Sequence, residues 1–152
     1  MADWGDVLAA EPEFASRVRA VFDTRRHKTL ATVRRDGSPR VSGIEVEFDN
    51  GRLLLGMMPG SVKARDLRRD PRLALHATSE DPPQDDPSAW MGDAKIAGVA
   101  DQESGPERPA EPSNRVRVDI REVALIRVGT PPDHLVIESW HPDRGLLRRE
   151  RR

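Results

Sequence analysis

Residues 28–58 read KTLATVRRDGSPRVSGIEVEFDNGRLLLGMM, and their pattern decides the fold. Apolar and polar side chains alternate along 39–48, which is typical of a β-strand with one buried face. Two turns interrupt the pattern, because Asp36-Gly37 and Asn50-Gly51 supply residues that adopt the positive φ of tight hairpin turns. The stretch therefore predicts three antiparallel strands, at 28–35, 39–48 and 52–58.

The rest of the chain adds one helix before these strands and further strands after them. Apolar residues recur at helical spacing in the N-terminal part, which predicts an amphipathic helix over 11–27. Ser61 can cap a short helix that Asp70-Pro71 ends. In the strand that begins at residue 115, the alternation changes phase near Arg121, which indicates a β-bulge or a strand break. The remaining predicted strands lie at 72–78, 94–100 and 135–140.

These elements predict a mainly β protein with short helices, built as an antiparallel barrel or sandwich of about six to seven strands. We expect one domain over 1–152, because this length is that of a single typical domain. Its expected parts are an N-terminal helix at 11–27, a barrel at 28–141 and a solvated basic tail at 142–152. Proline-containing loops are predicted at 79–93 and around Pro106, Pro109 and Pro112.

The composition excludes several classes of protein. With 25 basic and 26 acidic residues the net charge is −1, so no overall field favours nucleic acid or an anionic membrane. The chain has no cysteine, which excludes disulfides, thiolate metal sites and thiol nucleophiles. The N-terminus lacks the pattern of a leader and no long apolar stretch follows, so we expect a soluble, cytoplasmic protein. Three Phe, three Trp and no Tyr predict a thin core, which favours a homodimer.

The segment 60–72, GSVKARDLRRDPR, is the most informative for chemistry because it holds five basic residues and two acidic ones. A helix that starts after Ser61 has unpaired N–H groups and a partial positive charge at its first turn. Lys63 adds an ammonium, so a phosphate can dock there. The alternative is a solvated helix face with intrahelical ion pairs, and this segment alone does not decide between the two.

Two blocks of the sequence resemble a known family. The first, LATV at 30–33 followed by DGSPRVS at 36–42, is similar to the first hairpin of the pyridoxamine 5'-phosphate oxidase-like split barrels. The second, KARDLRRDPR at 63–72, resembles the phosphate-binding helix of the same family. The resemblance is close from about Thr29 to Thr78 and looser up to Trp140. It implies a split β-barrel of the FMN-binding type.

The resemblance also implies a coenzyme and the place where it binds. The coenzyme, FMN or an 8-hydroxy-5-deazaflavin, would lie in a groove at the dimer interface, with its phosphate at the start of the short helix. By position, the candidate cofactor-binding residues are Ser42, Gly56, Met57, Ser61, Val62, Lys63 and Arg65.

The chain departs from the family pattern in three places. The arginine that family members often carry beside the phosphate lysine is absent, because Ser61 and Val62 stand there. Glu47 lies about where the flavin-using oxidases have a lysine near the ring. The C-terminal Arg-x-His motif that binds pyridoxine phosphate in the true oxidases has no counterpart, so we do not expect vitamin B6 oxidation.

Two functional hypotheses follow. In the first, the protein is an oxidoreductase that transfers a hydride between the coenzyme and a small organic substrate. In the second, it is a non-enzymatic barrel that binds flavin, haem or another ligand. No catalytic residue is assignable, and the four histidines lack the spacing of a metal site, so no metal is expected. Trp90 and Trp140 could flank a coenzyme ring, although packing is the commoner role of such residues.

Overall fold

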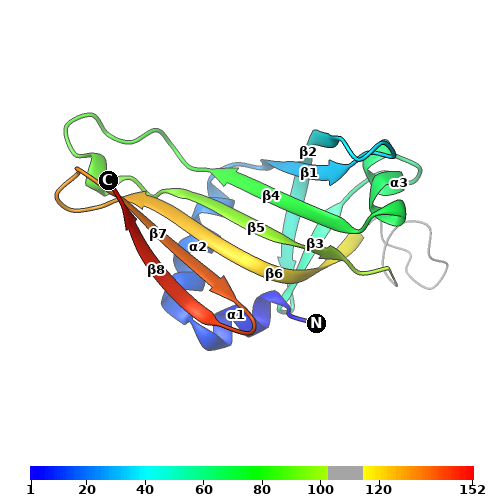
Figure 1. Cartoon of the computed structure of the whole chain (residues 1–152), viewed down its shortest axis with the longest axis horizontal. Helices are drawn as coiled ribbons and strands as arrows, with labels where there is room; N and C mark the ends of the chain where they lie inside the picture. The colour runs from blue at the N-terminus through cyan, green and yellow to red at the C-terminus, as the bar shows by residue number, and fades with distance from the viewer. Residues whose placement is uncertain (103–114) are drawn as a thin grey trace.

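The computed structural model describes residues 1–102 and 115–152, and it consists of an antiparallel sheet with helices against it (Figure 1). The helices are α1 (Trp4–Ala10), α2 (Pro12–Thr24), α3 (Val62–Arg69) and the 3-10 turn η1 (Pro87–Ala89). The strands are β1 (His27–Val33), β2 (Pro39–Asp49), β3 (Arg52–Gly56), β4 (Arg72–Thr78), β5 (Asp93–Ala100), β6 (Arg115–Val128), β7 (Leu135–His141) and β8 (Gly145–Arg151).

The eight strands follow the order β3-β2-β1-β4-β5-β6-β7-β8, and a further pairing of β3 with β6 closes the first six into a barrel. The long strand β6 makes this possible because it changes partner along one edge. Its first residues pair with β3, Arg115 opposite Gly56, whereas its last residues pair with β7, Val123 opposite Trp140. Strands β7 and β8 therefore extend the sheet beyond the barrel. The predicted antiparallel split barrel is confirmed.

The predicted irregularity at Arg121 is a β-bulge within a continuous strand. Ala97 pairs with Glu122 while the next residue of β5, Gly98, pairs with Ile120, so Arg121 is the extra residue of β6. Because of the bulge, Ile120 and Val123 both point into the core.

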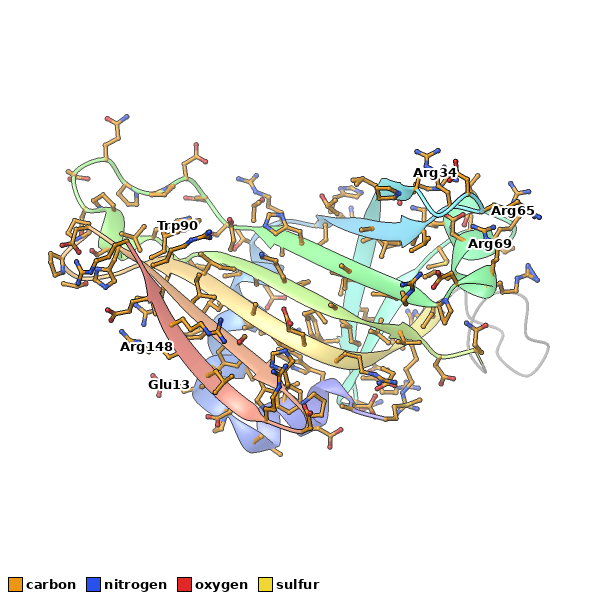
Figure 2. The ribbon with its side chains drawn as sticks, viewed as in Figure 1. Glu13, Arg34, Arg65, Arg69, Trp90 and Arg148 are labelled. Carbon is orange, nitrogen blue, oxygen red and sulfur yellow. The ribbon has the colours of Figure 1, made fainter. Side chains whose placement is uncertain are left out.

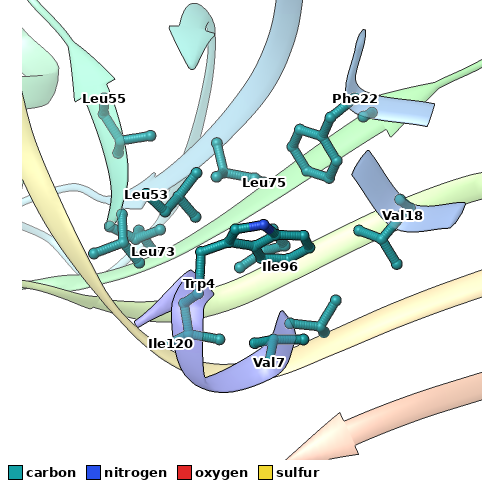
Figure 3. Close-up of a cluster of buried hydrophobic side chains, with 14 of the residues drawn as sticks. Trp4, Val7, Val18, Phe22, Leu53, Leu55, Leu73, Leu75, Ile96 and Ile120 are labelled. Atoms are coloured by element: carbon teal, nitrogen blue, oxygen red, sulfur yellow. The ribbon is translucent and has the colours of Figure 1, made fainter. Parts of the chain in front are cut away.

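The core fills the barrel and the space between the sheet and the first two helices. Figure 3 shows Trp4 and Val7 of α1 beside barrel side chains such as Ile96 and Ile120, and all four are buried. The Trp4 ring meets the Phe48 ring edge-on, with centroids 4.8 Å apart. Aliphatic side chains supply most of this interior, which is how a chain with few aromatic residues fills its barrel.

The extreme N-terminus completes the β6 edge between its two partners. The backbone N–H of Ile120 donates to the carbonyl of Ala2 at 2.8 Å, and the N–H of Ala2 donates to the Asp119 carboxylate at 2.9 Å. Asp3 forms an ion pair with Arg117 of the same strand. This part of β6 lies between the β3 and β7 ladders, so the N-terminal residues satisfy backbone groups that no strand covers.

The prediction of a single helix over 11–27 is wrong in the number of helices and at the C-terminal end. Two helices precede the barrel, because Asp3 and Asp6 form a capping box that starts α1, and Pro12 begins α2 at a position where its missing N–H costs nothing. The second helix ends at Thr24, and His27 already belongs to β1. The amphipathic spacing described α2 correctly but gave no signal for the short α1.

A buried ion-pair network holds α2 against the extension of the sheet. The guanidinium of Arg17 in α2 donates two hydrogen bonds, of 2.8 and 2.9 Å, to the carboxylate of Glu138 in β7. Arg127 of β6 reaches the same carboxylate at 3.3 Å. The hydrogen bonds from Arg17 lower the pKa of Glu138, and the Arg127 contact adds to this, although burial opposes them.

The predicted basic tail is also wrong, because most of it forms the strand β8. Each residue from Gly145 to Arg151 pairs with β7, and Leu146 packs against the core. The arginines of β8 stay exposed, as expected for a charged edge strand that resists further pairing. The sequence of β8 lacks a clear alternation of apolar and polar residues, because arginines occupy several of its positions.

The predicted loop at 79–93 includes η1, and the indole N–H of Trp90 donates to the Glu80 carbonyl at 2.7 Å. The proline-containing loop at Pro106, Pro109 and Pro112 lies outside the described residues.

No helix within residues 1–102 and 115–152 is long and apolar enough to cross a membrane.

Candidate functional site

The short helix α3 is held against β2 by its own first turn. The Ser61 hydroxyl caps the helix by accepting a hydrogen bond from the Ala64 N–H at 3.3 Å. The ammonium of Lys63 donates to the Gly43 carbonyl of β2 at 2.6 Å. The backbone N–H groups of Val62 and Lys63 belong to the first turn, where a helix provides no acceptor for them. The start of α3 and the Lys63 ammonium thus form a positively charged corner beside β2.

A buried carboxylate fixes the rest of α3. Asp66 is 2% exposed and accepts hydrogen bonds from Thr32 at 2.8 Å, Arg40 at 2.7 Å and Arg69 at 3.0 Å. Burial alone would raise the pKa of Asp66, but the hydrogen bonds from Arg40, Thr32 and Arg69 outweigh it, and the pKa lies below its ordinary value. Asp66 therefore ties the helix to both β1 and β2.

Two glycines give the corner a flat floor on the outer face of the barrel. Gly43 in β2 and Gly56 in β3 are both exposed. A Cβ atom built on Gly43 would meet no atom within 4 Å, and one built on Gly56 would meet only the Glu45 carbonyl at 4.0 Å. A planar group can therefore approach the sheet backbone closely at this place.

Charged side chains surround the floor. In the strand register Gly56 lies between Glu45 of β2 and Arg115 of β6, so these side chains share its face. Glu45 forms an ion pair with Arg26 at 3.4 Å, and the His27 imidazole lies 3.7 Å from the same carboxylate. Glu47 pairs with Arg115 at 2.9 Å. Each carboxylate of the floor thus has its own cation, and Lys63 faces a carbonyl rather than a carboxylate.

Four of the predicted site residues contribute to this corner. Gly56 is part of the floor, and Ser61, Val62 and Lys63 form the start of α3. Val62 is 43% exposed, so no side chain buries the helix start.

The structure places the other three predicted residues differently. Ser42 alternates with Gly43 along β2, so its side chain points to the inner face, where its hydroxyl oxygen is buried without a hydrogen-bond partner among the described residues. The side chain of Met57 belongs to the core. Arg65 lies two residues after Lys63, about 200° around the helix, and therefore projects from the opposite side of α3.

Gly43 and Glu45 were missing from the predicted site although both lie on its floor. The signal was present in the alternation of 39–48, which places Gly43 and Glu45 on the polar face of the strand. No residues among those described form a cluster of three or more possible metal ligands.

A closed antiparallel barrel with a helix start against its second strand defines the class of split-barrel proteins. The chain belongs to the pyridoxamine 5'-phosphate oxidase family, because residues 14–149 match that family.

Solved structures of this class share the fold at low sequence identity. A pyridoxamine 5'-phosphate oxidase-related, FMN binding protein from Nostoc punctiforme PCC 73102 superposes with a TM-score of 0.62 at 12% identity, covering 93% of this chain and 96% of that one. PhzG from Burkholderia lata 383, solved in complex with tetrahydrophenazine-1-carboxylic acid, gives 0.62 at 14% identity, covering 93% and 92%. A heme binding protein from Mycobacterium smegmatis gives 0.52 at 15% identity, covering 89% and 86%.

Proposed function

We propose that the protein is a coenzyme-dependent oxidoreductase that transfers a hydride between FMN or an 8-hydroxy-5-deazaflavin and a small organic substrate in the cytoplasm. The observation that carries the proposal is the positive corner of Lys63 and the α3 start beside the open floor of Gly43 and Gly56. Such a coenzyme carries a phosphate and a flat ring system, and the positive corner and the open floor support binding of each in turn.

In this proposal, the residues of the chain bind and orient the coenzyme. Lys63 and the N–H groups of Val62 and Lys63 hold the phosphate, while the glycine floor lets the ring lie against the backbone. The bound coenzyme supplies the two electrons and the proton that make up the hydride. The ion-paired Glu45 and Arg115 limit how the ring can lie, because their side chains stand on either side of Gly56.

The homodimer is part of the same proposal. A row of small side chains crosses four neighbouring strands in register on the outer face, formed by Val41, Ala31, Ala74 and Ala97. Val41 in this row is 69% exposed. A second copy would cover this flat apolar face and add the second wall of the coenzyme groove.

The relatives support the proposal at the level of the class. The Nostoc protein is described as FMN binding, and PhzG was solved in complex with tetrahydrophenazine-1-carboxylic acid. Both share the fold with this chain along nearly their whole length, which supports a ligand-binding function for this type of barrel.

A ligand-binding function without chemistry is the second candidate. Two histidines from different strands, His76 and His141, line one groove of about 610 Å³ on the outer face of β4 to β8. The floor of this groove includes the apolar side chains of Ala124, Ile126 and Ile137. Imidazoles can ligate haem iron, although His141 would have to exchange its contact with Glu122 at 2.9 Å for the iron. One split barrel of similar fold is described as heme binding.

Spectroscopic titration separates these functions. We expect the purified protein to bind FMN or the deazaflavin coenzyme with a Kd below about 100 μM, a range in which a charge-assisted site is detectable. Binding of neither coenzyme would refute the oxidoreductase. Haem binding with a Soret shift that His141→Ala or His76→Ala removes would favour the second candidate.

A variant of the floor gives a sharper test. Gly43→Val should abolish coenzyme binding, because the new side chain would occupy the floor, while the folded state should tolerate it in the open space around Gly43. Thermal unfolding of the same sample checks that the variant is folded. Unchanged coenzyme affinity in a folded Gly43→Val protein would mean that the coenzyme ring binds elsewhere.

A further inference from the structure

A second group of cations lies on the other side of α3. Four arginines line a hollow of about 400 Å³, namely Arg35, Arg65, Arg68 and Arg69. They come from two elements, since Arg35 belongs to the turn between β1 and β2 and the others belong to α3. Figure 2 shows Arg65 and Arg69 at the end of the molecule where α3 lies, with Arg34 of the turn nearby.

The arrangement is unfavourable for the free protein. Arg65 and Arg69 are four residues apart on one helix, a spacing at which like charges destabilise the helix. Arg69 is partly neutralised, because it donates to the Asp66 carboxylate and to the Val33 carbonyl at 2.9 Å. Within residues 1–102 and 115–152, the guanidinium groups of Arg35 and Arg65 form no ion pair or hydrogen bond, and no acidic side chain of these residues lines the hollow.

The hollow is distinct from the proposed coenzyme corner. Lys63 and Arg65 point away from each other, about 200° apart around the helix. A ligand in the hollow would therefore meet the C-terminal half of α3 and the β1–β2 turn, whereas a phosphate at Lys63 would meet the first turn and β2.

We propose that this hollow is a binding site for a compact anion with two or more phosphate groups, such as a diphosphate or triphosphate moiety. Guanidinium groups donate paired hydrogen bonds that match phosphate oxygens. Several arginines around one hollow match an anion that carries three or four negative charges better than one with a single carboxylate. The ligand would also remove the repulsion among the arginines.

Isothermal titration calorimetry with inorganic tripolyphosphate and diphosphate tests the site at low salt. The double variant Arg35→Gln/Arg65→Gln removes the two guanidinium groups that have no partner, and leaves Arg69 with its structural contacts to Asp66. The matched control is Arg149→Gln/Arg151→Gln, which lowers the net charge equally on the exposed strand β8. Lys63→Ala reports on the coenzyme corner.

The expected result is saturable tripolyphosphate binding that the hollow variant weakens at least about tenfold, as two charge-assisted contacts are lost. The β8 control should stay within about threefold, the effect of net charge alone, and Lys63→Ala should bind as the wild type does. Absence of binding, or equal weakening in the β8 control, would overturn the site. If Lys63→Ala alone lost tripolyphosphate binding, the anion would bind at the coenzyme corner, and the proposed site in the hollow would be overturned as well.

Discussion

At the scale of single residues, Asp66 decides where α3 lies. Asp66→Asn should lower the free energy of unfolding by about 3 kcal/mol, because it removes the charge that pairs with Arg40 and Arg69 in a buried place. Chemical denaturation measures the difference. Asp70→Asn is the control, since that carboxylate pairs with the exposed Arg72 and should matter far less. An equally small effect of both changes would mean that apolar contacts alone hold the helix.

Lys63 is the residue on which the coenzyme proposal depends most directly. Lys63→Ala should weaken coenzyme binding by at least about 1.5 kcal/mol, roughly tenfold in Kd, because a charge-assisted contact to phosphate is lost. Fluorescence or absorbance titration measures this. Arg65→Ala removes a charge from the opposite side of the same helix and should leave the coenzyme Kd nearly unchanged. If both variants weaken binding alike, the effect is one of general charge.

Acid should destabilise the protein through its paired carboxylates. The pKa of Glu138 is lowered from its ordinary value of 4.5 and that of Asp66 from 3.8, so both stabilise the fold above these values. This contribution is lost as the pH falls through the lower pKa of the folded state. The free energy of unfolding should therefore decline below about pH 4.5, and Glu138→Gln should show a shallower decline. A decline as steep in the variant as in the wild type would contradict this role of Glu138.

The sequence predicted which residues gather near the coenzyme corner better than it predicted their directions. Alternation along 39–48 correctly separated the two faces of the strand. Ser42 was included by its position in the family pattern, which carries no information on the face to which its side chain points. In the helix, Lys63 and Arg65 project from opposite sides. A run of basic residues in the sequence does not show this difference in direction.

At the scale of elements, Gly98 allows the bulged pairing of β5 with β6. Gly98→Ala should destabilise the protein by about 1–3 kcal/mol, because the added Cβ would overlap the Asp119 carbonyl oxygen and crowd the Val118 side chain. Thermal or chemical unfolding measures the change. Gly43→Ala adds the same methyl group to a strand where nothing lies within 4 Å, and should be nearly neutral. Equal stability of the two variants would show that the bulge can relax.

Elements with strong periodicity were predicted well, and those without it were not. The strand at 72–78 was predicted with the bounds that the structure shows, and the bulge at Arg121 followed from a change in phase. The short α1 depends on its cap and on the contact of Trp4 with the barrel, which local periodicity does not report. Strand β8 depends on pairing with β7, so its arginine-rich sequence alone resembled a solvated tail.

At the scale of the whole molecule, the row of small side chains predicts a dimer. Ala74→Glu should convert the dimer to a monomer, because a carboxylate on each copy would be buried in an apolar contact. Size-exclusion chromatography with light scattering measures the mass. Arg148→Glu changes an exposed residue of β8, a strand that contributes nothing to the row, and should leave the mass unchanged. A wild-type protein that runs as a monomer at micromolar concentration would refute the dimer.

Barrel closure was the part of the architecture that the residue pattern left open. Hairpins and alternation are compatible with a barrel or a sandwich, and the pairing of β3 with β6 joins segments about sixty residues apart. The resemblance supplied the split barrel where local patterns could not. The family match and the closed sheet now agree on it.

The contact of Ala2 with β6 sets the order in which the molecule can be completed. The hydrogen bond from Ala2 to Asp119 spans 117 residues, so the residues around Ala2 can dock only after β6 has been synthesised. Contacts of such long range slow folding, because the chain loses much entropy before they form. Until Ala2 docks, the Ile120 N–H lacks the acceptor that it has in the folded structure, so this stretch of β6 is an open strand edge.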